Sequence, residues 1–507
     1  MQTNILEYLE RTAARMPDKA AFLGEEGQLT FRELSLQARV IGSRLCRDGF
    51  YGQPVVVFMK KQPKTVAAFL GVVYSGCYYV PLDAEMPRQR IELILDGLRP
   101  GACICDETTV RTVQALGNCG RVYRYEDAAS GQADDAVLGE VRERQIDTDP
   151  IYIVFTSGST GVPKGVVGCH RAVIDYIENL CEVLRFDEHT VFGNQTPLYF
   201  DACLKEILPT LKYGASTYLI PRKCFLFPVQ LVEYLNAHRI NTLCWVVSAL
   251  TFVSALRTFE KVRPQYLRLV AFASEVFPIR QLNLWRAAVP GARFVNLYGP
   301  TEATGICCYY EVDREFAEGE TLPIGRPFRN TGIMLLDEKD RVPPPGAQGE
   351  ICIRGSRLTL GYYGDPGKTG AVFVQNPLNQ HYPERIYRTG DIGRYNARGE
   401  LVFLSRKDGQ VKHMGHRSEL GEIEAAACAH EAVGSACCVF DPEKKKLTLY
   451  YAGEAAAAGL TVWLREKLPR YMLPNAVCRL DAMPTTANGK IDRNYLKELC
   501  MGGKYDE

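Results

Sequence analysis

The stretch IYIVFTSGSTGVPKG, residues 151–165, joins an apolar run to a loop rich in glycine and hydroxyl side chains. An apolar, β-branched run of this length predicts a buried strand. Glycine lets the backbone approach an anion closely, and Lys164 adds positive charge, so the loop indicates a phosphate-binding site. The spacing is not that of the P-loop G-x-x-x-x-G-K-[ST], because Pro163 stands five residues after Gly158 and Gly165 follows Lys164. We therefore expect a phosphate loop of another kind.

Around this stretch, up to about residue 400, short apolar runs alternate with helical patterns. Strands are expected at 54–59, 151–155, 242–247, 267–272 and 292–298, and helices at 32–47, 64–76, 171–184, 228–238 and 278–288. Such alternation favours an α/β architecture with buried parallel strands. The segments GEICIRG (349–355) and GELVFLSR (399–406) follow a Pro/Gly turn and predict a β-rich subdomain.

Near residue 405 the pattern changes. The segment 409–430 predicts a strand, a glycine turn and a helix; two strands across a charged turn are expected at 435–453 and a helix at 461–468. A chain of 507 residues also exceeds what one core usually organises. We expect a large N-terminal domain of α/β layers with a β-rich subdomain (1–404) and a small, mobile α+β C-terminal domain (405–507).

Composition excludes several classes of protein. Lys+Arg 60 against Asp+Glu 59 leaves a net charge of +1, which argues against nucleic-acid binding by bulk electrostatics. No apolar stretch is long enough for a secretion signal or a membrane span, so a cytoplasmic location is expected. The 18 cysteines are scattered without a C-x-x-C, which predicts buried free thiols rather than a metal or redox site.

Three further polar loops follow apolar runs: NLYGPTEAT (296–304), YRTGDIGRY (387–395) and PTTANGKIDR (484–493). Singly, each is equally well explained as a surface turn. The four loops in this order resemble the adenylate-forming superfamily. Within it the chain is most similar to the amino-acid adenylation domains of nonribosomal peptide synthetases and to D-alanine–carrier protein ligases. The resemblance covers nearly the whole chain, from residue 29 to Lys490.

The resemblance implies ATP and Mg²⁺ as cofactors. In it the loop 156–165 closes on the β- and γ-phosphates and must release pyrophosphate, Tyr298 stacks on adenine, and Asp391 binds the ribose hydroxyls. Glu302 holds Mg²⁺, which suits a hard oxygen ligand. For Glu302 and Asp391 the alternative is a solvated loop carboxylate. The implied ATP-binding set is Thr156, Ser157, Gly158, Ser159, Thr160, Gly161, Lys164, Asn296, Tyr298, Gly299, Thr301, Asp391 and Arg406.

Lys490 is the catalytic residue that the resemblance implies. Negative charge builds on phosphorus and on both the entering and leaving oxygens when a carboxylate attacks the α-phosphate. An ammonium held there stabilises the transition state more than the ground state, and its removal typically costs ~10²–10³ in rate. Alone, a lysine beside glycine is more often surface charge.

Asp201, in YFDACLKEIL, resembles the family aspartate that pairs with the ammonium of an α-amino acid. Aryl-acid relatives have no ammonium, so an aspartate here argues for an amino-acid substrate. The structural alternative is an N-cap of the following helix. The positions that match the family's substrate pocket are Asp201, Ala202, Lys205, Val247, Ala271, Ala273, Leu297, Gly305 and Ile306.

Lys205 bears on the identity of the amino acid. An ammonium in an apolar cavity is costly unless it is paired. A substrate carboxylate would pair it, which favours glutamate or a similar acidic amino acid. In the alternative, Lys205 pairs with Asp201 or Glu206, or extends outward, and the substrate is apolar. D-alanine ligases have a cysteine at the position of Ala273 and no lysine at that of Lys205, which disfavours D-alanine.

A second half-reaction is implied, in which the small domain rotates about a hinge at Asp408 and withdraws Lys490. A phosphopantetheine thiol of a carrier protein then attacks the adenylate. No carrier-type Gly-Gly-x-Ser segment occurs, so the carrier is expected on another protein or in sequence beyond this chain. The hinge block departs from the family with Ser405 in place of glycine and Met414 in place of arginine.

Two other functions remain open from the sequence. One is an acyl- or aryl-CoA ligase of the same superfamily, which shares the first step but activates fatty or aromatic acids. The other is a non-catalytic, cysteine-rich protein that binds metal or changes redox state. Neither is expected to bind nucleic acid or a membrane.

Overall fold

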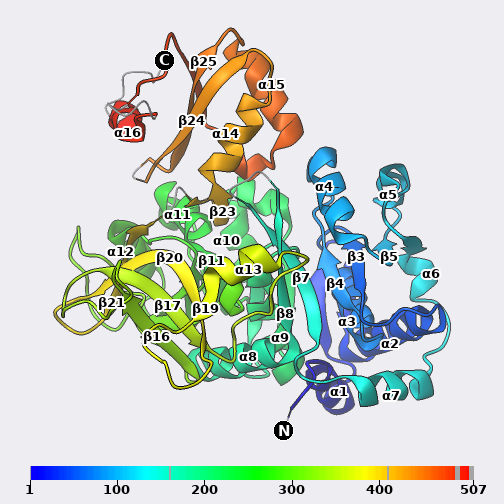
Figure 1. Ribbon diagram of the computed structural model, residues 1–507. Helices are drawn as coiled ribbons and strands as arrows, with labels where there is room; N and C mark the ends of the chain where they lie inside the picture. The colour runs from blue at the N-terminus through cyan, green and yellow to red at the C-terminus, as the bar shows by residue number, and fades with distance from the viewer. Residues whose placement is uncertain (1, 159–161, 408–409, 443, 486–490, 502–507) are drawn as a thin grey trace. The chain divides into compact units, whose positions relative to one another are not determined.

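The computed structural model describes residues 2–158, 162–407, 410–442, 444–485 and 491–501 (Figure 1). Contacts divide the chain into two compact units. The first comprises Met1–Ala84, Leu98–Val154 and Gly165–Lys407, and the second comprises Glu85–Gly97, Phe155–Lys164 and Asp408–Glu507. Each unit is described by itself.

A nine-stranded sheet forms one half of the first unit. Its strands from β13 to β1 run parallel, and the strands beyond them, β14, β15 and β2, run antiparallel. In sheet order the strands are β15 (Arg326–Pro327), β14 (Cys308–Glu311), β13 (Arg293–Tyr298), β12 (Leu269–Ala273), β11 (Thr242–Val246), β9 (Val191–Asn194), β10 (Ser216–Leu219), β1 (Ala20–Gly24) and β2 (Gly27–Thr30).

A second sheet has seven strands and includes the one expected at 151–155. In sheet order they are β18 (Gly361–Tyr362), β8 (Lys164–Cys169), β7 (Pro150–Thr156), β4 (Tyr78–Pro81), β3 (Pro54–Phe58), β5 (Ala102–Cys105) and β6 (Arg121–Arg124). Strands β7, β4, β3, β5 and β6 pair in parallel. The interior strands β3, β4 and β5 are buried at every residue, as expected for a sheet covered by helices on both faces.

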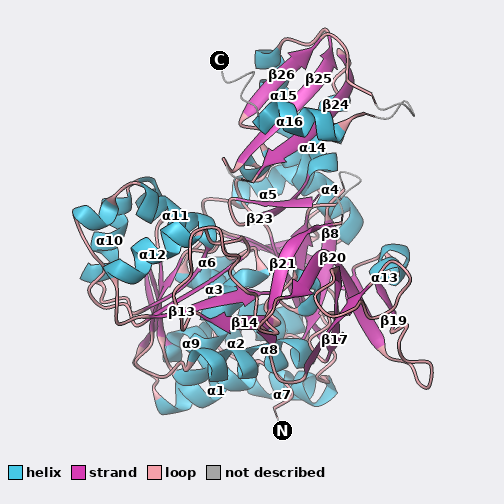
Figure 2. Ribbon diagram, turned by 90° about the vertical axis from the view of Figure 1, so that its left-hand side faces the viewer, coloured by secondary structure: helices cyan, strands magenta, loops and turns pink. Residues whose placement is uncertain are grey.

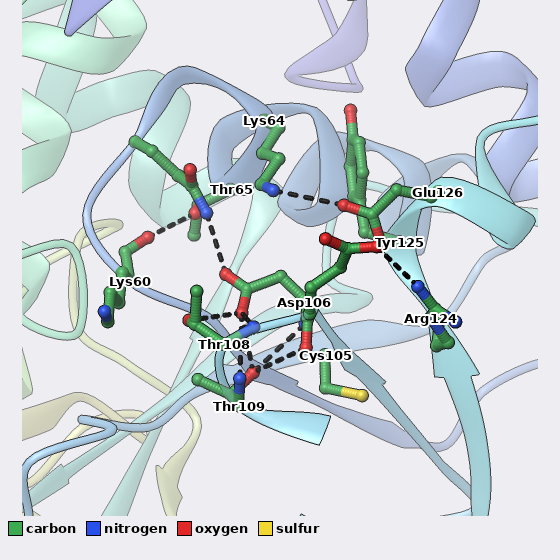
Figure 3. Close-up of polar contacts among 12 residues, drawn as sticks. Lys60, Lys64, Thr65, Cys105, Asp106, Thr108, Thr109, Arg124, Tyr125 and Glu126 are labelled. Atoms are coloured by element: carbon green, nitrogen blue, oxygen red, sulfur yellow. Dashed lines mark hydrogen bonds and ion pairs between the residues drawn. The ribbon is translucent and has the colours of Figure 1, made fainter. Parts of the chain in front are cut away.

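Asp106 directly follows β5 and lies at the carboxyl ends of β3 and β5 (Figure 3). Open parallel sheets often bind ligands at this edge. Its carboxylate accepts hydrogen bonds from Gln62 Nε2 at 2.8 Å and from the Thr108 hydroxyl at 2.6 Å. The hydroxyl of Thr109 donates to the Phe58 carbonyl oxygen at 2.7 Å and so joins the two strands. The Asp106 carboxylate at this edge is therefore occupied by neighbouring side chains, and we place the candidate site elsewhere.

Helices cover the sheets of the first unit (Figure 2). The longest, α2, begins at a capping box in which Thr30 and Glu33 bond each other's backbone. Helix α3 is buried at all but one residue, and it begins with a proline at its first position. The helices are α1 (Leu6–Arg15), α2 (Phe31–Arg47), α3 (Pro63–Tyr74), α5 (Val110–Leu116), α6 (Tyr125–Ala128), α7 (Asp135–Arg144), α8 (His170–Leu184), α9 (Leu204–Tyr213), α10 (Pro228–Ala237), α11 (Val247–Ala255), α12 (Ile279–Ala288) and α13 (Pro366–Val372).

The β-rich subdomain is a five-stranded antiparallel sheet within the first unit. Its strands are β16 (Thr331–Leu336), β17 (Gly349–Gly355), β20 (Arg385–Tyr395), β19 (Phe373–Gln375) and β21 (Leu401–Arg406). Strand β20 is central and pairs with β17, β19 and β21. The predicted fold class, a large domain of α/β layers with a β-rich part and a smaller α+β domain, is confirmed.

The second unit contains α4 (Arg88–Leu98), the hairpin of β22 (Gln410–His413) and β23 (His416–Glu419), and α14 (Leu420–Cys428). Beyond them β24 (Val433–Asp441), β25 (Lys446–Gly453) and β26 (Ala476–Leu480) form a sheet with helices α15 (Ala457–Lys467) and α16 (Arg493–Met501). The strand, glycine turn and helix expected at 409–430 are all present, but a second strand, β23, stands between the turn and the helix and was not predicted. Met414 and Gly415 both have positive φ, 52° and 79°, which makes the tight turn of a two-stranded hairpin.

All eighteen cysteines lie in described residues and are free thiols; most are buried, and Cys428 is exposed. Over the described ranges no group of three or more His, Cys, Asp and Glu side chains is arranged to hold a metal ion. In the same ranges no helix has the length and apolar character needed to cross a membrane.

Candidate active site

Asp201 lies in a short 3₁₀ turn, Asp201–Cys203, directly before α9. Burial raises the pKa of its carboxyl, and a hydrogen bond from the Thr301 side chain and the charge of Lys205 oppose that rise. Helix α9 begins at Leu204 with Cys203 as its N-cap residue, so the expectation that Asp201 caps this helix was wrong. The carboxyl is instead a buried acceptor that contacts the loop following β13, with a further hydrogen bond from the Ala202 backbone.

Lys205 is buried in the first turn of α9, with 1% of its surface exposed. Among described residues its ammonium makes no hydrogen bond or ion pair. The neighbouring Glu206 is also buried, and its Oε2 accepts a hydrogen bond from the Asn194 amide. Burial raises the pKa of Glu206 to about 7, and the positive charge of Lys205 is the largest influence that opposes it. The Lys205 ammonium therefore acts on Glu206 and Asp201 through space, without direct contact.

The predicted pocket positions fall into two groups. Ala271, Ala273, Leu297 and Ile306 belong to one buried hydrophobic cluster, which also includes Tyr176 on α8 and Cys244 on β11. Val247, the first residue of α11, packs in another cluster with Trp245 and Leu250. Successive residues of a strand face opposite sides, so Cys244 rather than Trp245 or Val247 is directed toward the first cluster.

The loop from Gly299 to Ile306 forms a wall of this region and is tightly folded. Thr304 and Gly305 both have positive φ, 54° and 85°. A Cβ added at Gly299 would lie 2.0 Å from the Gly305 carbonyl oxygen, so no larger residue fits there without a shift of the backbone.

Arg357 holds the loop from outside. Its fully buried guanidinium donates from Nη1 to the Ile306 carbonyl oxygen at 2.6 Å, and Nη2 pairs with Asp175 at 3.0 Å. The Thr304 hydroxyl donates in return to the Arg357 carbonyl oxygen at 2.6 Å. This role could not be predicted from residue type, because an arginine in a Gly-Ser-Arg segment is typical of an exposed turn.

Three of the residues expected at the nucleotide come together at the carboxyl end of β13, where this loop begins. Tyr298 donates from its hydroxyl to Asp391 Oδ2 at 2.5 Å, and Arg406 Nη1 bonds Asp391 Oδ1 at 2.6 Å. Asp391 and Arg406 stand opposite each other on β20 and β21. The nearby Asn296 amide donates to the Pro323 carbonyl oxygen at 2.8 Å. Asp391 is thus a buried, oriented carboxylate, not a solvated loop residue.

Glu302 is also buried, and its Oε1 accepts a hydrogen bond from the Tyr362 hydroxyl at 2.8 Å. The alternative of a solvated carboxylate is therefore wrong for this residue too. Mg²⁺ commonly takes one or two carboxylates and fills its other positions with water and substrate phosphates. A single carboxylate oriented by Tyr362 fits that donor set.

The phosphate-loop residues lie in the second unit. Thr156 donates from its hydroxyl to the Lys164 carbonyl oxygen at 3.5 Å, and Ser157 donates to the Arg417 carbonyl oxygen at 2.8 Å. The Gly158 backbone N–H bonds the carboxylate of Glu422, which is buried and also pairs with Arg90. Ser159, Thr160 and Gly161 of the loop lie outside the described residues, as do Asp408 and Lys490.

Comparisons with known families match both parts of the chain. Residues 9–363 match the model of the AMP-binding enzyme family, and residues 422–490 match that of the AMP-binding enzyme C-terminal domain.

Individual proteins agree with these matches. The chain is 32% identical over 504 residues to tyrocidine synthase 1 of Brevibacillus parabrevis, covering 98% of this chain and 45% of that protein. It is 32% identical to L-proline--[L-prolyl-carrier protein] ligase of Streptomyces coelicolor, and the match covers 96% of this chain and 94% of that protein. Among solved structures it resembles holo-PA1221, an NRPS protein containing adenylation and PCP domains, with a TM-score of 0.83 and 25% identity. The match covers 97% of this chain and 84% of that chain. The chain spans less than half the length of the synthases it matches.

Proposed function

Because this chain belongs to the AMP-binding enzyme family and is an adenylate-forming ligase of the nonribosomal-peptide adenylation type, we propose that it activates an α-amino acid with ATP. One oxygen of the amino-acid carboxylate attacks the α-phosphorus, and a new C–O–P bond forms. The bond between the α-phosphorus and the bridging oxygen of the β-phosphate breaks, and pyrophosphate leaves with the electron pair. The product is an aminoacyl-adenylate.

The buried carboxyl of Asp201 is the observation that supports an amino acid as the substrate. The carboxyl is removed from water and bonded to Thr301 and the Ala202 backbone. An ionised carboxylate in such surroundings is stabilised by a cation, and an α-ammonium supplies one. A fatty or aromatic acid has no group for this position, so a CoA ligase for such acids is the less favoured function.

The distribution of buried charge favours an acidic amino acid. Lys61 donates from Nζ to the carbonyl oxygens of Asn194 at 2.9 Å and Gln195 at 3.1 Å. The positive charge of Lys61 and the negative charge of Glu206 also stabilise each other. The charge of Lys205 acts on both Glu206 and Asp201, so two lysines and two carboxyls share this region. A substrate ammonium adds a third positive charge, and a side-chain carboxylate of the substrate would balance it.

The nucleotide would bind at Tyr298, Asp391 and Arg406. The carboxylate of Asp391 would accept from the ribose hydroxyls, and Tyr298 and Arg406 keep it oriented. When bound, Mg²⁺ would offset phosphate charge, with Glu302 as its protein ligand. Lys490 would stabilise the charge that develops as pyrophosphate leaves.

The activated amino acid would then pass to a carrier protein. The thiol of a phosphopantetheine group attacks the carbonyl carbon, a thioester forms, AMP leaves and the thiol proton is released. The relatives that support this step are a prolyl-carrier protein ligase and a structure with an attached PCP domain. We place the hinge for the change between the two steps at Asp408.

Pyrophosphate exchange into ATP, measured across all amino acids of both hands and a set of fatty and aromatic acids, tests the proposal. We expect exchange with an acidic amino acid and a loss of ~10²–10³ in rate for Lys490→Ala. Exchange with aromatic or fatty acids alone would contradict amino-acid activation. Equal activation of the same amino acid by Lys205→Leu would contradict the acidic assignment while leaving adenylation intact.

A further inference from the structure

Tyr176 on α8 is fully buried, and its hydroxyl has no hydrogen-bond partner among the residues that the structure describes. The phenol end of the ring lies against the pocket wall. A Cβ added at Gly305 would lie 3.4 Å from Cζ and 3.5 Å from the hydroxyl oxygen of Tyr176. The absence of a side chain at Gly305 thus leaves the phenol facing the loop that carries Ile306.

The surroundings of the phenol are those of the proposed substrate pocket. Burial raises the pKa of Tyr176 far above its usual value, and the charge of Asp201 is the next largest cause. Cys244 also acts on Tyr176, and the same thiol is influenced by the charge of Lys205. The charge of Asp201 thus acts on Tyr176 and that of Lys205 on Asp201, and α8, α9 and the loop after β13 each contribute residues to one buried cluster.

A buried hydroxyl that lacks a partner costs free energy, and natural proteins rarely keep one without a reason. A phenylalanine would fill the same space without that cost. A hydroxyl is worth keeping at this position if a ligand bonds it, since a site built to bond a substrate oxygen discriminates strongly against analogues that lack the oxygen.

We propose that Tyr176 is a specificity-determining residue whose phenol donates a hydrogen bond to the side-chain carboxylate of the substrate, while Lys205 supplies the opposite charge. The inference rests on the proposed function and adds a residue to it. Hydrogen bonds to a charged acceptor are among the stronger ones in proteins, so the phenol contributes to the choice of an acidic side chain over a neutral one.

The chain offers a matched control. Tyr152 on β7 is also fully buried with a hydroxyl that lacks a partner among described residues. Its phenol, however, lies at Gly168 on β8, where an added Cβ would be 2.2 Å from Cζ and 2.5 Å from the hydroxyl oxygen. Tyr152→Phe removes the same atom from the same buried cluster, and Asp201 acts on this phenol too, but the ring lies against β8 and not against the loop that carries Ile306.

The test compares Tyr176→Phe and Tyr152→Phe with the unmodified protein in pyrophosphate exchange. For Tyr176→Phe we expect KM for the preferred acidic amino acid to rise about tenfold or more with kcat changed little. KM for a neutral analogue of the same length, such as norvaline, should stay the same. Tyr152→Phe should leave both values unchanged. The unfolding midpoint without substrate should not fall for either variant, because neither hydroxyl has a partner to lose within the described ranges.

Each other result overturns the inference. An unchanged KM for Tyr176→Phe with the acidic amino acid would show that the phenol does not bond the substrate, with the proposed function intact. An equal rise for the acidic and the neutral amino acid would assign Tyr176 a packing role. A variant that does not fold would show that the hydroxyl has a protein partner. Activation of apolar amino acids alone by the unmodified protein would remove both the inference and the acidic substrate.

Discussion

The guanidinium of Arg357 donates a 2.6 Å hydrogen bond to the carbonyl oxygen of Ile306. The two residues are separated by fifty-one positions, and the bond holds the end of a loop in which two consecutive residues have positive φ. The Thr304 hydroxyl bonds back to Arg357, so two residues at this end of the loop are held by the same arginine. The shape of the pocket wall thus depends on a buried residue fifty-one positions further along the chain.

Replacing this arginine tests that dependence. Arg357→Met keeps much of the volume but leaves the Ile306 carbonyl oxygen and the Asp175 carboxylate without their buried donor. We expect the free energy of unfolding to fall by about 3 kcal/mol, measured by urea denaturation. Arg357→Lys keeps the charge but not the forked donors, and should recover part of the loss. The range of amino acids activated should broaden. A loss below about 0.5 kcal/mol, the size of an ordinary surface change, would contradict the clamp.

The Tyr298–Asp391–Arg406 arrangement gives a second prediction. Asp391→Asn removes the carboxylate charge. Tyr298 and Arg406 orient this carboxylate, and the ribose hydroxyls would donate hydrogen bonds to it. Hydrogen bonds to a charged group contribute about 1.5–3 kcal/mol, so KM for ATP should rise about 10- to 100-fold, with KM for the amino acid little changed. Asp340→Asn is a control, because Asp340 pairs with Arg388 of the same strand β20 but is half exposed. Equal effects of both substitutions would remove Asp391 from the nucleotide site.

His170 gives a prediction about pH. It is fully buried, its Nδ1 accepts from the Ile5 backbone N–H at 3.2 Å, and burial lowers its pKa to about 3. The folded protein therefore keeps this imidazole neutral below pH 6.5, whereas the unfolded chain takes up a proton. The unfolded state binds more protons between about pH 6.5 and 3, so stability falls as pH falls through that window.

From pH 7.5 to pH 5.5 this single group should reduce the free energy of unfolding by about 1.4 kcal/mol. Carboxylates also titrate, so the measurement compares the unmodified protein with His170→Gln at both pH values. The variant should lose about 1.4 kcal/mol less over the interval. Parallel loss in both proteins would show that His170 takes up a proton in the folded state.

Most strands could be predicted from the sequence, since buried parallel strands are continuous apolar runs with few alternatives. The run at 54–59 became β3 (Pro54–Phe58) and the run at 292–298 became β13 (Arg293–Tyr298). The second strand of the hairpin at 410–419 was missed, because it is four residues long and all of its residues, HRSE, are polar.

The sequence predicted those site residues whose chemical role follows from their residue type. Acidic side chains in glycine loops identified Asp391 and Glu302, and the structure shows both buried and bonded to tyrosines. Tyr176 could not be found in this way, because an aromatic residue on the apolar face of α8 looks like any core residue. Its distinguishing feature is a buried phenol with no partner in the part of the chain that the structure describes, which only the three-dimensional neighbourhood reveals.

Cys428, the exposed thiol at the end of α14, gives the protein a natural attachment point for a fluorophore. The other cysteines are buried or half-buried, and all of them fall in described residues, so brief maleimide treatment should modify this position first. The dye would report on rearrangements of the second unit during turnover, with no cysteine added or removed.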